Sequence, residues 1–447
     1  MRIAIVTPSA AFAESAGARI RYRRMIEAAA EGVTIELVPI DRIDRTADAY
    51  LFSKTYQMAA PAIAYGLAAA GKRVALDVFD DYFSERGDVR LQRFHRWFAD
   101  MSRAVHRVAV STPAMKARLD PRLVVPATVI DDPAPTLDPD GLAARLAEKA
   151  ARLVPGQLNL LWFGIAANPY FAAGLGDLAA FAHALSGEAS EADGGRHHLT
   201  ILTNPHGASE ATLAALAAAP VDVTWRSWSE AAEAAALAEA DVAVLPVNAG
   251  AFSTAKSLNR AVTALAAGTQ VLSLGAPLYR PLAPFLYRDL ACLRLDAAAG
   301  VLRLRPGRVP RLADALARVA SPRTAAARLV DLFSDIEPEP RPPHAVVLGD
   351  RLEQPALLGA SGALTVSAAD GLSADIRVGA TITVADGVAE RLAGSWQGSG
   401  APLPPLSGHG VIDLVRMRAR LATLEATARR LLPNHTLFVA HEEILAP

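Results

Sequence analysis

The segment Ala255–Gly268, AKSLNRAVTALAAG, places two cations where a helix is expected to begin. It follows the apolar run DVAVLPV and precedes TQVLSLG, a pattern that predicts strand, loop, helix and strand. Lys256 and Arg260 are four residues apart and are expected on one helix face, with Ser257 as a cap and Asn259 in the first turn. Cations at a helix N-terminus oppose its dipole unless an anion lies between them, so this segment predicts a diphosphate site.

Two aspartates stand at the end of another expected strand, in LDVFDDYF. Asp80 and Asp81 are candidate catalytic residues, because carboxylates at the carboxyl end of a strand can accept sugar hydroxyls or act as a general base. The alternative is that they cap the helix that follows, a position that aspartate favours.

Other expected loops carry glycine, arginine and tryptophan. Gly17 and Arg19 follow the first strand, where a glycine lets a ligand approach the backbone and an arginine can meet an anion. Gly164 ends LNLLWFG, and Trp225 and Trp228 follow a later strand, where an indole can stack on a nucleobase. A solvated loop, a tight turn and isolated tryptophan packing are the alternatives. His206 is a further candidate for a ligand contact.

Short apolar runs alternate with helical patterns, which predicts parallel sheets covered by helices on both faces. Asp131–Asp140 and Glu337–Pro343 are rich in proline and acids and are expected to be linkers. They divide the chain into two doubly wound α/β domains, residues 1–135 and 150–335, and a small α+β appendage, residues 344–447. Ligands bind beyond the carboxyl ends of parallel strands, so the two facing domains are expected to form a binding cleft.

The composition excludes several classes of protein. The chain has 447 residues with 52% apolar residues and a formal net charge of −1, which argues against disorder and against a nucleic-acid partner. The single cysteine, Cys292, is expected as a buried thiol in a strand. No apolar run reaches the ~18 residues of a membrane-spanning helix, so a cytoplasmic protein is expected. The arginine-rich amphipathic segment Leu91–Arg107 leaves peripheral membrane contact open, with an ordinary core-facing helix as the alternative.

The chain carries, in this order, RIAIVTP, LDVFDDYF, RVAVSTPAMKARL, LNLLWFG, DVAVLPV, AKSLNRAVTALAAG and TQVLSLGAP. From Met1 to Asp335 this set resembles the glycosyltransferases of the GT-B fold, and most closely the group-1 or family-4-like bacterial sugar transferases. The resemblance implies two Rossmann-like domains with a nucleotide-sugar, a UDP- or GDP-sugar, between them. It offers no counterpart for the appendage.

The resemblance also implies roles for the candidate residues. The second domain would hold the donor and the first the acceptor, and no metal or further cofactor is expected. Lys256, Ser257, Asn259 and Arg260 would hold the diphosphate, Trp225 to Trp228 the base and Gly17 the phosphate or sugar, and Asp80 or Asp81 would face the acceptor or transferred sugar. Gly164, independently of the resemblance, follows a strand where a glycine suits a phosphate or sugar.

One departure from the family stands at the same helix. Many relatives carry two glutamates there, where this chain has Ala255 and Thr263. The earlier glutamate contacts the transferred sugar and the later one holds the ribose hydroxyls, so Thr263 would take the ribose position without a charge.

The sequence therefore predicts a glycosyltransferase that moves a sugar from a nucleotide donor to a glycan, lipid-linked, protein or small-molecule acceptor in polysaccharide biosynthesis. The missing glutamates favour a second hypothesis, a non-catalytic protein that binds a nucleotide-sugar or scaffolds an assembly complex. A third, a nucleotide-sugar epimerase, would need paired acids and a histidine in the cleft.

Overall fold

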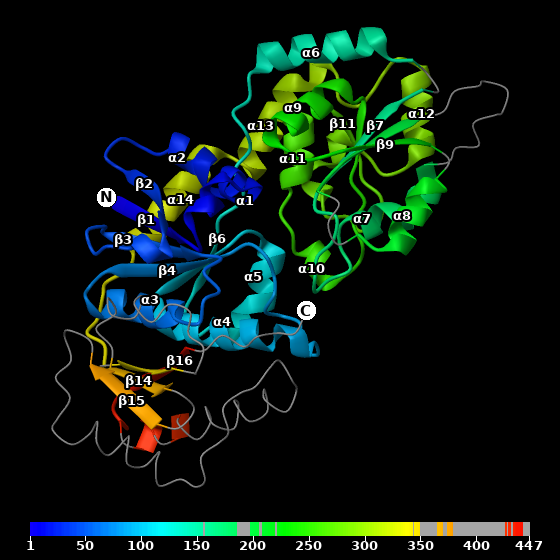
Figure 1. The fold of residues 1–447 in the computed structure, drawn as a ribbon. Coiled ribbons are helices and arrows are strands. Elements are labelled where there is room, and N and C mark those ends of the chain that lie inside the picture. The colour runs from blue at the N-terminus through cyan, green and yellow to red at the C-terminus, as the bar shows by residue number, and fades with distance from the viewer. Residues whose placement is uncertain are drawn as a thin grey trace.

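A computed structural model describes residues 1–154, 157–185, 197–204, 208–219, 221–342, 344–348, 364–369, 373–378, 425–426, 428–430 and 432–440. These residues form two six-stranded sheets and one four-stranded sheet, each with its own set of strands (Figure 1). His206 lies outside the described residues, as do most residues from 411 to 432, for which the sequence also predicts a helix.

The first domain is a parallel sheet of order β2-β1-β3-β4-β5-β6. The strands are β1 (Arg2–Thr7), β2 (Thr34–Pro39), β3 (Ala49–Ser53), β4 (Arg73–Val78), β5 (Arg107–Val110) and β6 (Ala127–Val129). The helices are α1 (Ala16–Ala18), α2 (Arg24–Glu27), α3 (Ala60–Ala69), α4 (Gln92–Ala104) and α5 (Pro113–Leu119), and Arg19–Arg23 forms a π-helical turn between α1 and α2. The apolar side chains of α3, α4 and α5 pack on one face of the sheet, and α2 packs on the other.

The second domain is a parallel sheet of order β12-β11-β10-β7-β8-β9. Its strands are β7 (Asn159–Phe163), β8 (His198–Leu202), β9 (Asp222–Arg226), β10 (Val242–Val244), β11 (Gln270–Leu272) and β12 (Leu286–Tyr287). The helices are α7 (Leu175–Ala180), α8 (Glu210–Ala217), α9 (Glu230–Glu239), α10 (Ala251–Thr254), α11 (Asn259–Ala266), α12 (Leu290–Ala298) and α13 (Val309–Val319). Helices α9, α11 and α13 cover one face and α7, α8 and α12 the other, which confirms the expected doubly wound architecture.

Each sheet has one place where the direction of winding reverses. This switch lies between β1 and β3 in the first domain and between β7 and β10 in the second. The loops that leave these strands at their carboxyl ends diverge to opposite faces, which leaves a crevice where ligands of such folds bind. The fold therefore directs attention to the residues that follow β1, β3, β4, β7 and β10.

The chain crosses between the two domains twice. Helix α6 (Pro139–Arg152) packs Leu142 and Leu146 into the core of the second domain. Helix α14 (Pro322–Ser334) returns to the first domain (Figure 1). Its Leu329 and Phe333 belong to the apolar cluster that also contains side chains of β1, β3 and α2. The range 150–335 that the sequence predicted for the second domain thus ends with a helix that belongs to the core of the first.

The third sheet has the order β15-β14-β13-β16 and includes strands expected within the appendage. Its strands are β13 (His344–Leu348), β14 (Leu364–Ala369), β15 (Ser373–Val378) and β16 (Thr436–Ala440). It adjoins the first domain, since the Tyr65 hydroxyl of α3 donates to the Pro342 carbonyl at 2.9 Å and its ring lies 5.4 Å from that of Phe438. The linker before β13 also contacts the first domain, because Arg341 donates to the Ala104 carbonyl at 2.6 Å.

Cys292 corrects one sequence-based prediction. It lies on α12 rather than in a strand, and its side chain is exposed rather than buried. The Asp289 carboxylate accepts from the amides of Ala291 and Cys292 and so caps the helix. Among the helices of the described part of the chain, none combines the length and apolar character needed to cross a membrane.

Candidate functional site

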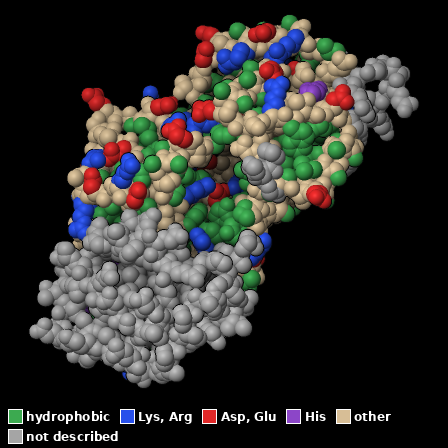
Figure 2. Space-filling model, in the orientation of Figure 1, with side chains coloured by type: hydrophobic (Ala, Val, Ile, Leu, Met, Phe, Trp, Pro, Cys, Tyr) green, Lys and Arg blue, Asp and Glu red, His purple; other side chains and the backbone are tan. Residues whose placement is uncertain are grey.

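A cavity of about 310 Å³ lies between the first two domains, beyond the carboxyl ends of β1, β4, β7 and β10. Its walls include Gly17 and Asp80 from the first domain and Gly164, Lys256 and Arg260 from the second. Figure 2 shows acidic and basic side chains meeting in the hollow between the two domains. The cleft expected from the fold is therefore present, and residues far apart in the sequence form it.

Lys256 contacts an acid of the opposite domain. Its ammonium group forms an ion pair with Asp80, and it lies in the loop between α10 and α11 rather than on a helix. The expectation that Lys256 and Arg260 share a helix face is therefore wrong, although both line the cavity. Ser257 also lines the cavity but does not cap α11, because Leu258 is the N-cap residue and no side chain caps that end. The first turn of α11 therefore keeps N–H groups available to an anion.

Arg260 and Asn259 occupy the first turn of α11. Within the described part of the chain the Arg260 guanidinium makes no ion pair, unlike Lys256. The Asn259 amide oxygen lies 3.5 Å from an Arg24 guanidinium nitrogen of the first domain. Asp177 in the same cavity wall interacts with this charge electrostatically but forms no direct ion pair with it. A cation left without a direct ion pair among the described residues, at the positive end of a helix, is suited to a phosphate.

Asp80 is held between two lysines. Its second carboxylate oxygen lies 2.8 Å from the ammonium of Lys54, and its side chain is 12% exposed. Burial by itself would raise the pKa of Asp80, but the charges of Lys256 and Lys54 outweigh it and hold the pKa well below its usual range. In this arrangement Asp80 is a hydrogen-bond acceptor and a weak general base.

Asp81 faces away from this cavity. Its carboxylate accepts from the Ser84 amide at 2.9 Å, from the Phe83 amide at 3.2 Å and from the Ser84 hydroxyl. These bonds stay within one loop, and no helix begins there, because the next helical turn is capped by Asp88; the capping alternative is therefore wrong for Asp81, which also does not line the cavity. Of the two candidate catalytic aspartates, only Asp80 reaches the cleft.

A second cavity of about 420 Å³ adjoins the first, and Gly164 and Arg260 line both. Trp228, Glu233 and Thr263 are also part of its wall on the second domain. A side chain at position 164 would enter this region, because a Cβ there would lie 3.3 Å from the Trp162 ring and 3.5 Å from Arg260. The two cavities together can hold a ligand with an anionic centre beside Arg260 and a larger group on each side.

Arg19 joins the domains at the second cavity. Its guanidinium donates to the Glu233 carboxylate at 2.8 Å, and it lies 5.9 Å from the centre of the Trp228 ring. The Trp228 indole N–H donates to the other oxygen of Glu233, also at 2.8 Å. Trp225, by contrast, is 41% exposed on β9 and lines neither cavity. Of the two predicted tryptophans, the structure brings only Trp228 to the site.

Three site residues were not identified from the sequence. Lys54 follows β3 with a φ of 52°, a left-handed conformation that is rare outside glycine, and it reaches Asp80. Asp177 on α7 lines the first cavity; burial raises its pKa, and it accepts from the Asn248 amide at 2.6 Å. Glu233 is the third. Only Asp177 had a local signal, because it follows two glycines at the start of an apolar run.

The domains also touch beside the cleft. The Thr112 hydroxyl donates to the Ala255 carbonyl at 2.8 Å, and Arg118 donates to the Thr254 hydroxyl at 2.9 Å. The Tyr82 ring of the first domain lies 5.7 Å from that of Phe252, which also lines the first cavity. With the ion pairs of Asp80 and Arg19, these contacts hold the two domains together around the cleft.

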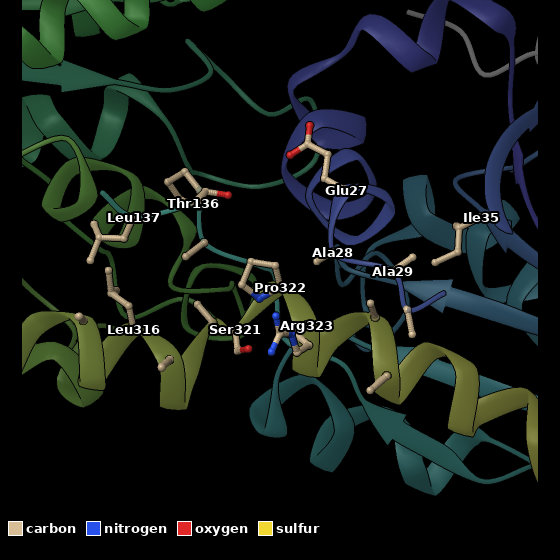
Figure 3. A pocket seen from close by; sticks show the side chains of 18 of the residues that line it. Glu27, Ala28, Ala29, Ile35, Thr136, Leu137, Leu316, Ser321, Pro322 and Arg323 are labelled. Carbon is tan, nitrogen blue, oxygen red and sulfur yellow. The ribbon is translucent and has the colours of Figure 1, made fainter. Parts of the chain in front are cut away.

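A larger cavity of about 880 Å³ lies at the two crossover segments, away from the strand ends (Figure 3). Leu137 and Leu316 from the second domain side and Ala29 and Ile35 from the first contribute to its wall. Its lining is mostly small and apolar, and the charged residues Glu27 and Arg323 stand at its edge. Because its lining has no cluster of cations and meets β2 at its amino end rather than its carboxyl end, this cavity does not have the character of a phosphate site.

No protein-family model matches the chain, and no curated protein matches it in sequence. Solved structures do match it. The N-terminal domain of Candida albicans trehalose-6-phosphate phosphatase is similar with a TM-score of 0.50 at 9% identity, over 75% of this chain and 97% of that domain. A structure described as trehalose-6-phosphate from E. coli bound with UDP-2-fluoro glucose has a TM-score of 0.49 at 11% identity, over 76% and 100% of the two chains. A UDP-forming α,α-trehalose-phosphate synthase from Burkholderia vietnamiensis has a TM-score of 0.44 at 12% identity, over 64% and 71%.

The chain has the GT-B fold. Two parallel six-stranded sheets with helices on both faces, opposed across a cleft, confirm the architecture that the sequence predicted. In this GT-B chain the cavity lies between the carboxyl ends of the strands of both domains, as expected for the ligand site of such sheets.

Proposed function

We propose that this chain is a glycosyltransferase that takes a sugar from a nucleoside diphosphate sugar, a UDP- or GDP-sugar, bound in the cleft. The observation that carries the proposal is the meeting of Lys256 and Arg260 with the uncapped first turn of α11 in one cavity wall. Cations and helix N–H groups together favour a diphosphate over a neutral ligand.

The same groups suit the reaction. In glycosyl transfer the bond from the anomeric carbon to the phosphate oxygen breaks, and its electron pair stays on the departing diphosphate. A bond forms between the anomeric carbon and an acceptor hydroxyl, whose proton leaves to a base. Lys256 and Arg260 stabilise the charge that develops on the diphosphate, and such fixed charges are most effective in a site that excludes water.

Two carboxylates can act on the sugar or the acceptor. Binding of the diphosphate at Lys256 competes with Asp80, which keeps its contact with Lys54 and can then accept a sugar hydroxyl. Asp177 is the better proton acceptor of the two, because burial raises its pKa whereas the lysines lower that of Asp80. The Phe252 ring, which lines the first cavity and packs on Tyr82, provides an apolar surface for a sugar ring.

A second candidate function is a nucleotide-sugar-binding or scaffold protein without turnover. Asp80 favours this function, because two lysines pair with it, and it is the one of the two sequence-predicted catalytic aspartates that reaches the cleft. Binding of the diphosphate is common to both functions, and only release of the sugar distinguishes them.

Thermal unfolding with UDP, GDP and ADP tests the binding step. At least one is expected to raise the Tm of the wild-type chain, and Lys256→Ala and Arg260→Ala are expected to reduce that rise. Arg318→Ala, an exposed arginine on α13 outside both cavities, is the matched control and should behave as wild type. The absence of any shift would refute the donor site. A rise in Tm without release of UDP or GDP from a panel of sugar donors would favour the second candidate function, a binding or scaffold protein without turnover.

A further inference from the structure

We propose that Glu233 binds the two ribose hydroxyls of the donor nucleotide and so supplies, from helix α9, the acid that is absent at Thr263. The inference rests on the proposed function and names a specificity-determining residue for it. It implies that the chain selects ribonucleotides over nucleotides that lack these hydroxyls.

Position is the first argument. Glu233 on α9 and Thr263 on α11 line the same cavity, the one that adjoins the diphosphate cavity through Arg260. The ribose of a nucleoside diphosphate is joined to the α-phosphate through its 5′ oxygen, so phosphates bound at Arg260 leave the ribose within reach of this second cavity. The carboxylate of Glu233 is the only acidic group in the described lining of that cavity.

The bonding capacity of Glu233 is the second argument. Its side chain is 7% exposed, and each oxygen accepts one hydrogen bond, from Arg19 and from the Trp228 indole. An ionised carboxylate offers about four acceptor positions, so about two remain for ligand donors. Adjacent ribose hydroxyls are a pair of donors with matching spacing, and a carboxylate in this role is a general feature of dinucleotide sites.

The surroundings of Glu233 are the third argument. Arg19 and Trp228 hold it from two directions, which fixes its orientation before a ligand arrives. Thr263 cannot perform the same task, because its hydroxyl carries no charge and lies 3.4 Å from the Asn259 amide oxygen.

The experiment compares UDP, GDP and ADP with their 2′,3′-dideoxy forms by isothermal titration calorimetry. Wild type is expected to bind the ribonucleotide at least about tenfold more tightly than its dideoxy form, because a hydrogen bond to a charged group is worth that much in Kd. Glu233→Gln is expected to weaken binding of the ribonucleotide until its Kd nearly equals that of the dideoxy form. The Kd of the dideoxy form itself is expected to stay within about twofold of its wild-type value.

Glu230→Gln is the matched control, since Glu230 is exposed on the same helix, approaches Arg19 at 3.7 Å and lines neither cavity. It is expected to keep the wild-type preference. Equal binding of both forms by wild type would overturn the inference without any variant, as would a Glu233→Gln variant that keeps the preference or weakens both forms equally. Those results would not contradict the proposed function. The absence of binding by every nucleotide refutes the proposed function itself, and the inference with it.

Discussion

Asp80→Asn is expected to lower the stability of the free protein and to raise its affinity for a nucleoside diphosphate. Asp80 is the acid that pairs with Lys256 across the domain boundary, and Lys54 holds its other oxygen at 2.8 Å. Under the proposed function, a diphosphate competes with Asp80 for Lys256. The substitution removes this competitor while keeping the size of the side chain.

The two effects can be sized separately. Breaking a buried ion pair by removing one charge costs about 3–5 kcal/mol. The side chains of Lys54 and Lys256 are 28% and 35% exposed and can turn toward water, so we expect a loss of about 1–2 kcal/mol in the free energy of unfolding. A lysine released to the ligand adds a charge-assisted hydrogen bond, which predicts a Kd about tenfold lower.

Urea unfolding of the free protein and calorimetric titration with UDP, GDP and ADP measure the two effects. Asp81→Asn is the control, because it disturbs the neighbouring loop bonds without touching Lys256. It should lower stability and leave nucleotide affinity unchanged. An Asp80→Asn variant with unchanged or weaker nucleotide binding would show that Asp80 does not compete for Lys256, and the account of the diphosphate site would have to be abandoned.

Two further predictions concern buried charge. Asp77→Asn should reduce the free energy of unfolding by about 3–5 kcal/mol, because it removes the acid that accepts from buried Arg21 at 2.7 and 3.0 Å; a loss below about 1 kcal/mol in urea unfolding would contradict this. Burial, reinforced by His435, lowers the pKa of His344 to about 4, so its contribution to stability is present above pH ~6.5 and is lost as the pH falls toward 4. This contribution is worth up to about 3 kcal/mol. Between pH 7 and pH 4.5, the free energy of unfolding should therefore fall less in His344→Gln than in wild type. An equal fall in both proteins would refute the role given to His344.

Local sequence patterns were sufficient for the elements of the fold. Apolar runs at β1, β4 and β7, followed by helical periods, predict parallel strands because both faces of such strands are buried. The run at Cys292 shows the limit of this signal. A short apolar segment fits a strand or a helix equally well, and the capping carboxylate of Asp289 was the local feature that distinguished them.

The sequence also determined which loops carry charge, but not which charges meet. The cations Lys256 and Arg260 could be placed near a helix start from their own neighbours in the chain. Their partners could not, because the Lys256–Asp80 pair spans 176 residues and the Arg19–Glu233 pair spans 214. Periodicity and capping report on contacts within a few residues, whereas these pairs depend on how two sheets face one another.

The tertiary structure decided the role of each acid. Asp80 and Asp81 are adjacent in sequence, yet one reaches the cleft and the other bonds to its own loop. Glu233 gave no local signal, since nothing in helix α9 itself distinguishes it from exposed Glu230. Its environment comes from Arg19 in one domain and Trp228 in the other, and a carboxylate buried between such partners is made by the packing of the domains rather than by its neighbours in sequence.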